Sequence, residues 1–112
     1  MTMISDPRGL LEYCRGMRTL FFACETVANN SGKSPEPPFA DVRDTWSQLH
    51  NKSTAFPFHD RAIVQTWEFV LSMTPTTRAE RLQRFDDDEA RILRDIDENG
   101  DGPRVISTTI YE

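Results

Sequence analysis

Residues 10–28, LLEYCRGMRTLFFACETVA, carry apolar side chains at steps of three and four residues. This spacing brings them onto one face of a helix, while Arg8, Glu12 and Arg15 fall on the other side. Asp6 followed by Pro7 is a typical helix start, and the NNSG sequence at 29–32 is a typical end. The stretch therefore predicts a long amphipathic helix. The residues expected to face inward are Leu10, Leu11, Cys14, Met17, Phe21, Cys24 and Ala28.

Two shorter helices are predicted after the proline-rich loop GKSPEPPF. One runs from about Ala40 to His50, and the next begins at Asp60, which we expect to cap it. The apolar stripe of the helix that begins at Asp60 is broad, and this helix is predicted to be the most buried. The inward residues are predicted to be Val42, Trp46 and Leu49 in the first of these helices, and Ile63, Val64, Trp67, Val70 and Leu71 in the second.

A last helix is predicted to begin at Thr77, because Thr77 and Glu80 have the spacing of a capping box. It is expected to run towards Glu98. A second pattern of this kind, Asp86 with Glu89, leaves two alternatives: one long helix, or a break at 85–88. The residues expected to face inward are Leu82, Phe85, Ile92, Leu93 and Ile96.

The fold class that these patterns predict is all-α. The 112 residues suit a single helical domain, 1–112, built as a compact bundle of four to five helices around one core. The closing segment, 103–112, reads PRVISTTIYE and is rich in β-branched residues. We expect it to form an extended C-terminal tail or a short strand.

The net charge of −5 lies mainly in the last third of the chain. Residues 1–76 hold 8 acidic and 7 basic groups, whereas residues 77–112 hold 10 acidic and 6 basic groups. Direct binding to nucleic acid needs a basic face, so we expect none. The N-terminus has no signal-peptide pattern and no apolar run approaches the length that crosses a membrane. These features predict a cytoplasmic protein without membrane contact.

No set of residues has the spacing of a known catalytic site or cofactor site. Cys14 and Cys24 are ten residues apart on one predicted helix, hence ~15 Å apart, which is too far for a disulfide. His50 and His59 match neither a helical metal pair nor a zinc finger. The SGKS sequence at 31–34 lacks the first glycine, the strand and the helix of a phosphate-binding loop. The sequence therefore predicts a protein that is not an enzyme and that holds no cofactor.

The stretch DIDENGDG at 95–102 resembles the first half of an EF-hand calcium loop, with the helix that leads into it. Two overlapping registers fit: Asp95, Asp97 and Asn99 with Gly100, or Asp97, Asn99 and Asp101 with Gly102. The second fits better, and it implies Asp97, Asn99 and Asp101 as calcium ligands. The resemblance covers about 14 residues, and the position of the closing glutamate holds Thr108, or Ile106 in the first register. The same residues are typical of a helix end, because NG and DG favour turns. We expect the helix end, and a calcium-binding module is the alternative.

The predicted function is binding to another protein. The acidic run Asp86, Asp87 and Asp88 could face a basic groove on that partner. Ile106, Ile110 and Tyr111 in the tail could pair with a sheet edge on the partner, or with a second copy to form a homodimer. Packing of the tail over the bundle is the third alternative, and we favour the first two. A small acidic protein of this kind would suit an accessory protein, an antitoxin, or a phage- or plasmid-encoded inhibitor of a host nucleic-acid-handling complex.

Overall fold

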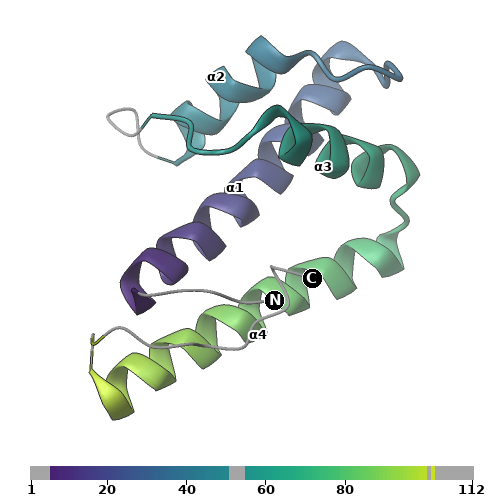
Figure 1. The fold of residues 1–112 in the computed structure, drawn as a ribbon. Coiled ribbons are helices and arrows are strands. Elements are labelled where there is room, and N and C mark those ends of the chain that lie inside the picture. Colours follow the sequence, from purple (N-terminus) through teal and green to yellow (C-terminus); the bar gives the residue numbers. More distant parts are fainter. Residues whose placement is uncertain (1–5, 51–54, 101, 103–112) are drawn as a thin grey trace. The chain divides into compact units, whose positions relative to one another are not determined.

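The structure is a computed structural model, and it describes residues 6–50, 55–100 and 102. It confirms the all-α fold class. Four helices follow one another along the described part of the chain, which contains no strand: α1 (Pro7–Ser31), α2 (Phe39–Leu49), α3 (Asp60–Ser72) and α4 (Pro75–Asn99) (Figure 1). The predicted tail, 103–112, lies outside the described residues.

Helix α1 begins and ends where the sequence predicts. The backbone N–H of Arg8 donates to the Asp6 carboxylate over 3.1 Å, so Asp6 caps the helix. At the other end Gly32 has a φ of +89°, a left-handed conformation that glycine adopts without strain. Leu10, Cys14 and Phe21 are buried as predicted. The first helix is thus confirmed at both ends, and of the seven residues predicted to face inward all are buried except Met17, which is half-buried.

Helices α2 and α3 differ from the prediction at three points. Val42 and Trp46 are buried, but Leu49 at the end of α2 is 53% exposed, so its inward placement is wrong. Asp60 is the first helical residue of α3 and His59 precedes it as the N-cap, with no side-chain capping hydrogen bond. The third helix is also not the most buried. Among the described residues, nine buried apolar side chains come from α1 and three from α3.

Helix α4 is one continuous helix, so the alternative of a break at 85–88 is excluded. It begins at Pro75, two residues before the predicted cap at Thr77. Phe85 and Ile92 are buried as predicted, whereas Leu93 is 42% exposed and its inward placement is wrong. The helix ends at Asn99, followed by Gly100 with a φ of +79°.

The chain divides into two compact units. The terminal unit comprises Met1–Gly16 with Pro75–Glu112, and the central unit comprises Met17–Thr74. In the terminal unit the Cys14 thiol lies 3.8 Å from the Phe85 carbonyl oxygen, and Arg15 pairs with Glu89 at 3.1 Å, which ties the start of α1 to α4. That the whole chain forms a single domain stays a prediction.

The central unit is held by contacts of α2 and α3 with the second half of α1 (Figure 1). The rings of Phe21 and Phe69 lie 5.9 Å apart between their centroids. Trp67 is fully buried, and its indole N–H donates to the Ser34 carbonyl over 2.7 Å, which satisfies the polar group of the ring. This hydrogen bond fixes α3 to the loop that follows α1.

Candidate partner-binding site

The segment between α2 and α3 is extended because of its proline. In AFPFH at 55–59, Pro57 has a fixed φ and disfavours a helical conformation in the residue before it. Two residues apart in an extended chain, Phe56 and Phe58 lie on the same side of the backbone. Both rings are half-buried. Local sequence therefore places two phenyl rings side by side at the start of α3.

The buried Trp46 side chain is the platform on which these rings rest. Its centroid lies 5.4 Å from that of Phe56 and 6.1 Å from that of Phe58, and both pairs meet edge to face. The two phenyl rings are 5.5 Å apart at an angle of 76°. His50 stacks on the indole at 4.6 Å, and its Nδ1 lies 3.2 Å from the Thr19 hydroxyl. The aromatic cluster is thus anchored to both α1 and α2.

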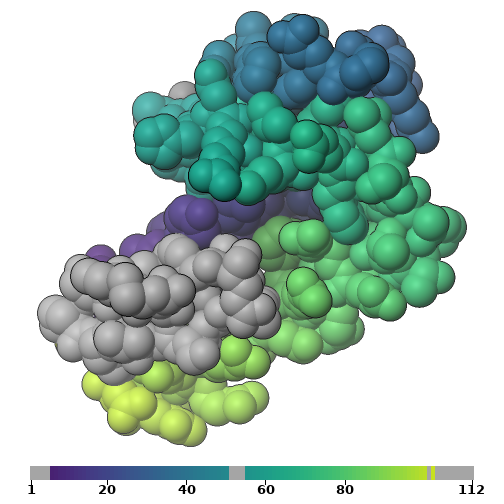
Figure 2. Space-filling model, turned by 45° about the vertical axis from the view of Figure 1, so that its right-hand side comes forward, coloured from purple at the N-terminus to yellow at the C-terminus, as the bar shows by residue number. Residues whose placement is uncertain are grey.

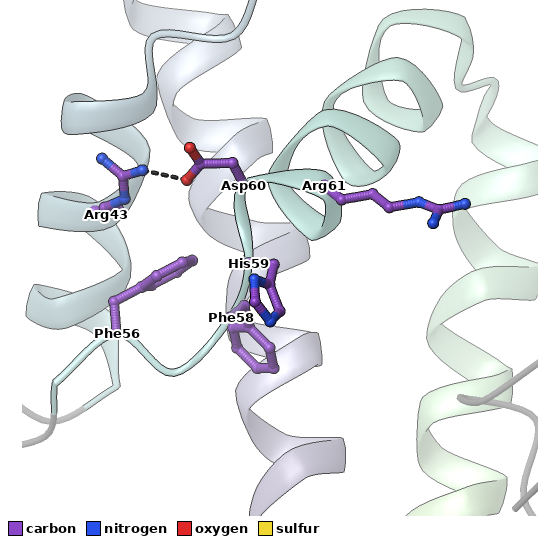
Figure 3. A pocket seen from close by; sticks show the side chains of 6 residues that line it. All are labelled: Arg43, Phe56, Phe58, His59, Asp60 and Arg61. Carbon is purple, nitrogen blue, oxygen red and sulfur yellow. Dashed lines mark hydrogen bonds and ion pairs between the residues drawn. The ribbon is translucent and has the colours of Figure 1, made fainter.

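Charged side chains border the aromatic rings. Arg43 of α2 and Asp60 of α3 form an ion pair and turn toward each other (Figure 3). The Arg43 guanidinium also lies 5.8 Å from the centre of the Phe39 ring, within the range of a cation–π contact. Asp60, which the sequence suggests as a helix cap, therefore links the two helices instead. Arg61 follows it on the exposed side of α3.

These residues line an open pocket of about 640 Å³ in the central unit. Its walls are Arg43, Phe56, Phe58, His59, Asp60 and Arg61 (Figure 3). Its volume lies within the range of known ligand sites. The space-filling view shows the surface of α2, in blue, directly against the teal surface that leads into α3 (Figure 2). The pocket is an open depression suited to a side chain that protrudes from another molecule.

The predicted partner-binding residues are only partly on the surface. Asp86 and Asp87 are exposed on α4, but Asp88 is 1% exposed and lies 3.6 Å from the Arg91 guanidinium. Asp88 therefore lies on the same face as Phe85 and Ile92 and takes no part in an exposed acidic strip. The other three, Ile106, Ile110 and Tyr111, lie outside the described residues.

The three residues of the calcium hypothesis do not form a loop in the described part. Asp97 and Asn99 still belong to α4, and side chains two apart on a helix point in different directions. Asp101 lies outside the described residues. The backbone N–H of Gly100 donates to the Ile96 carbonyl over 2.7 Å, as in a helix C-terminus. The predicted helix end is confirmed, and the described residues hold no group of three or more potential metal ligands.

Both cysteines are buried and free. Burial raises the pKa of the Cys24 thiol from 9.0 to about 12, because the low-polarity surroundings disfavour the thiolate. His50 contacts Thr19 and Trp46 in the structure. A thiol that keeps its proton is a poor nucleophile, so Cys24 is unsuited to nucleophilic chemistry.

We expect Cys24 to react with a thiol reagent at pH 8 at least ~100-fold more slowly in the folded protein than in urea, because it is buried and protonated. Because the pKa of Cys24 is higher in the folded state, the unfolded chain releases this proton at a lower pH than the folded chain does. The free energy of unfolding therefore falls as the pH rises from about 9 to about 12. Labelling is measured by mass spectrometry on a Cys14→Ala variant, so that only Cys24 can react. Rapid labelling of the folded protein would mean that α1 turns the face carrying Cys24 toward solvent.

The sequence gives a weak signal for the pocket. FPFHDR at 56–61 places two aromatic rings, a histidine and an arginine within six residues. Arg43 comes from a different helix, and its contact with Asp60 depends on how α2 packs on α3. The aromatic half of the site can therefore be read from the sequence, and the ion pair cannot.

No family model, curated protein or solved structure matches the chain. Within the ranges that the structure describes, no helix has both the length and the apolar character needed to cross a membrane.

Proposed function

We propose that this protein acts without catalysis, by binding another protein through the pocket between α2 and α3. The observation that carries the proposal is an open pocket in which two half-buried phenyl rings are bordered by two arginines. Aromatic and arginine side chains are enriched at protein interfaces and supply much of the binding energy there. The pocket combines both types.

The rigidity of the pocket supports this use. Phe56 and Phe58 are held by Trp46, and Arg43 is held between Phe39 and Asp60. A site whose side chains are already fixed loses less conformational entropy on binding than a flexible surface does. Binding is also favoured when a partner removes the phenyl rings from water, by roughly 25 cal/mol for each Å² of apolar surface buried.

The acidic surface of α4 suggests the finer role. Exposed carboxylates of Asp86, Asp87, Asp97 and Glu98 would repel nucleic acid and attract a basic partner surface. An accessory protein, an antitoxin, or a phage- or plasmid-encoded inhibitor of a nucleic-acid-handling complex would use such a surface in the cytoplasm. A homodimer through residues 103–112 belongs to the same proposal.

The test begins with capture of binding partners from the native cell and continues with the purified pair. We expect Phe58→Ala and Arg61→Ala each to weaken the complex at least ~10-fold in titration calorimetry, as for residues at the centre of an interface. Leu93→Ala, which truncates an exposed apolar side chain of α4, is the matched control and should leave the affinity unchanged. Circular dichroism checks that each variant folds.

Two results would overturn the proposal. One is unchanged affinity in the folded Phe58→Ala and Arg61→Ala variants. The other is a loss of affinity confined to Asp86→Asn with Asp87→Asn, which would place the interface on α4. Arg61 is exposed, so its variant keeps the test valid if Phe58→Ala does not fold.

A further inference from the structure

We propose that the pocket between α2 and α3 recognises a short acidic peptide segment of the partner. An aliphatic side chain of the segment would lie against Phe56 and Phe58, and a neighbouring carboxylate would pair with Arg61. This inference rests on the proposed function, and it adds the chemistry of the ligand. It follows from three properties of the pocket: its local charge, its free hydrogen-bond donors and the angle between its rings.

The pocket is basic although the chain is acidic. Arg43 and Arg61 line it, against the single carboxylate of Asp60, and because Arg43 pairs with Asp60 the excess positive charge belongs to Arg61. The central unit as a whole, Met17–Thr74, holds 6 acidic and 5 basic residues, so its net charge is −1. The remaining −4 of the total −5 belongs to the terminal unit. A negatively charged group is therefore attracted locally and meets little opposing charge from the rest of the central unit.

Donors remain available for an incoming carboxylate. A guanidinium carries five N–H donors, and the ion pair with Asp60 occupies only part of those of Arg43. Arg61 forms no ion pair or side-chain hydrogen bond within the described residues. Figure 3 shows the Arg61 side chain directed away from that of Arg43, so a carboxylate of the ligand would pair with Arg61, which is exposed.

The geometry of the rings favours an aliphatic side chain over a flat aromatic ligand. Phe56 and Phe58 meet at 76°, so they form a corner and offer no pair of parallel faces. A nucleotide base binds by stacking on such faces. A branched aliphatic side chain fills a corner with contacts to both rings. The charge of −5 also disfavours a nucleic acid strand, which would bring many phosphates to the protein.

A random peptide display library, selected on the full chain, tests this inference. We expect the selected peptides to carry Asp or Glu within a few residues of Leu, Ile or Val. A labelled synthetic peptide of the best sequence should bind, by fluorescence anisotropy, about tenfold more weakly to Arg61→Glu, since one attractive charge pair becomes repulsive. Arg94→Glu, an equal charge change at an exposed position of α4, is the control and should bind like the native chain. Replacing the acidic residue of the peptide by lysine should restore binding to Arg61→Glu.

Three outcomes would contradict the inference: selected peptides that are neutral or basic, equal effects of the Arg61 and Arg94 variants, or tighter binding of adenosine monophosphate or oligodeoxythymidine than of any peptide. If no peptide is selected but Phe58→Ala still weakens the complex with the intact partner, the acidic-segment inference fails and the proposed function stands. If Phe58→Ala and Arg61→Ala both leave that complex unchanged, both fail.

Discussion

Replacement of Trp46 by alanine is expected to lower the free energy of unfolding by about 3–5 kcal/mol, the usual range for truncating a fully buried tryptophan. Trp46 has no exposed surface and contacts the rings of His50, Phe56 and Phe58. Its removal leaves a cavity that those rings cannot all fill, because each is also fixed by its own backbone segment. Urea denaturation followed by circular dichroism measures the loss.

Leu49→Ala is the matched control for Trp46→Ala. Leu49 lies one turn further along α2 and is 53% exposed, so its truncation should change the free energy of unfolding by less than ~0.5 kcal/mol. The prediction fails if Trp46→Ala lowers the free energy of unfolding by less than ~1 kcal/mol, or if Leu49→Ala lowers it more than Trp46→Ala does. Either result would mean that α2 does not bury the face that carries Trp46.

The helices could be predicted from the sequence because their local signals agree. In α1 the cap at Asp6, the apolar spacing and Gly32 all indicate the same bounds. At the start of α4 two signals compete. Pro75 suits the first position of a helix, whereas Thr77 and Glu80 suit a capping box two residues later. In the structure the helix begins at the proline. Local sequence alone does not show which of the two start signals is stronger.

Which face of a helix is buried depends on its neighbours, and local sequence predicts this less well. On α4 the buried positions are Phe85, Asp88 and Ile92, at steps of three and four. Hydrophobicity alone places Asp88 on the polar side and Leu93 inside. The helix is rotated relative to that prediction, and the buried Asp88 lies 3.6 Å from the Arg91 guanidinium, a nearby cation that makes the burial of a carboxylate tolerable.

The sequence does not predict the complete pocket, because its residues come from two helices and the segment between them. Local sequence suggests Asp60 as a cap and AFPFH as a connection between helices. The ion pair joins Asp60 to Arg43, 17 positions away along the chain, and it depends on the packing of α2 on α3. Long-range pairs of this kind have no local signature in one sequence. The acidic run at 86–88 had such a signature, yet the structure exposes only two of its three residues.

The rotation of α4 leads to the second large effect. Ile92 has no exposed surface, and Leu93 beside it is 42% exposed. Ile92→Ala should therefore lower the free energy of unfolding by about 2–5 kcal/mol, because it removes buried methyl groups and leaves a cavity. Leu93→Ala should lower it by less than ~1 kcal/mol, since much of that side chain already contacts water.

The two variants remove similar amounts of apolar side chain from adjacent positions of one helix, so differences in helix propensity are small beside the effect of burial. Both are measured by urea denaturation, with the dependence on urea concentration compared to confirm that each variant unfolds in the same way. Equal losses would mean that α4 buries a face centred between the two residues. A larger loss for Leu93→Ala would restore the face predicted from hydrophobicity alone, and would return Asp88 to the surface as part of the acidic strip with Asp86 and Asp87.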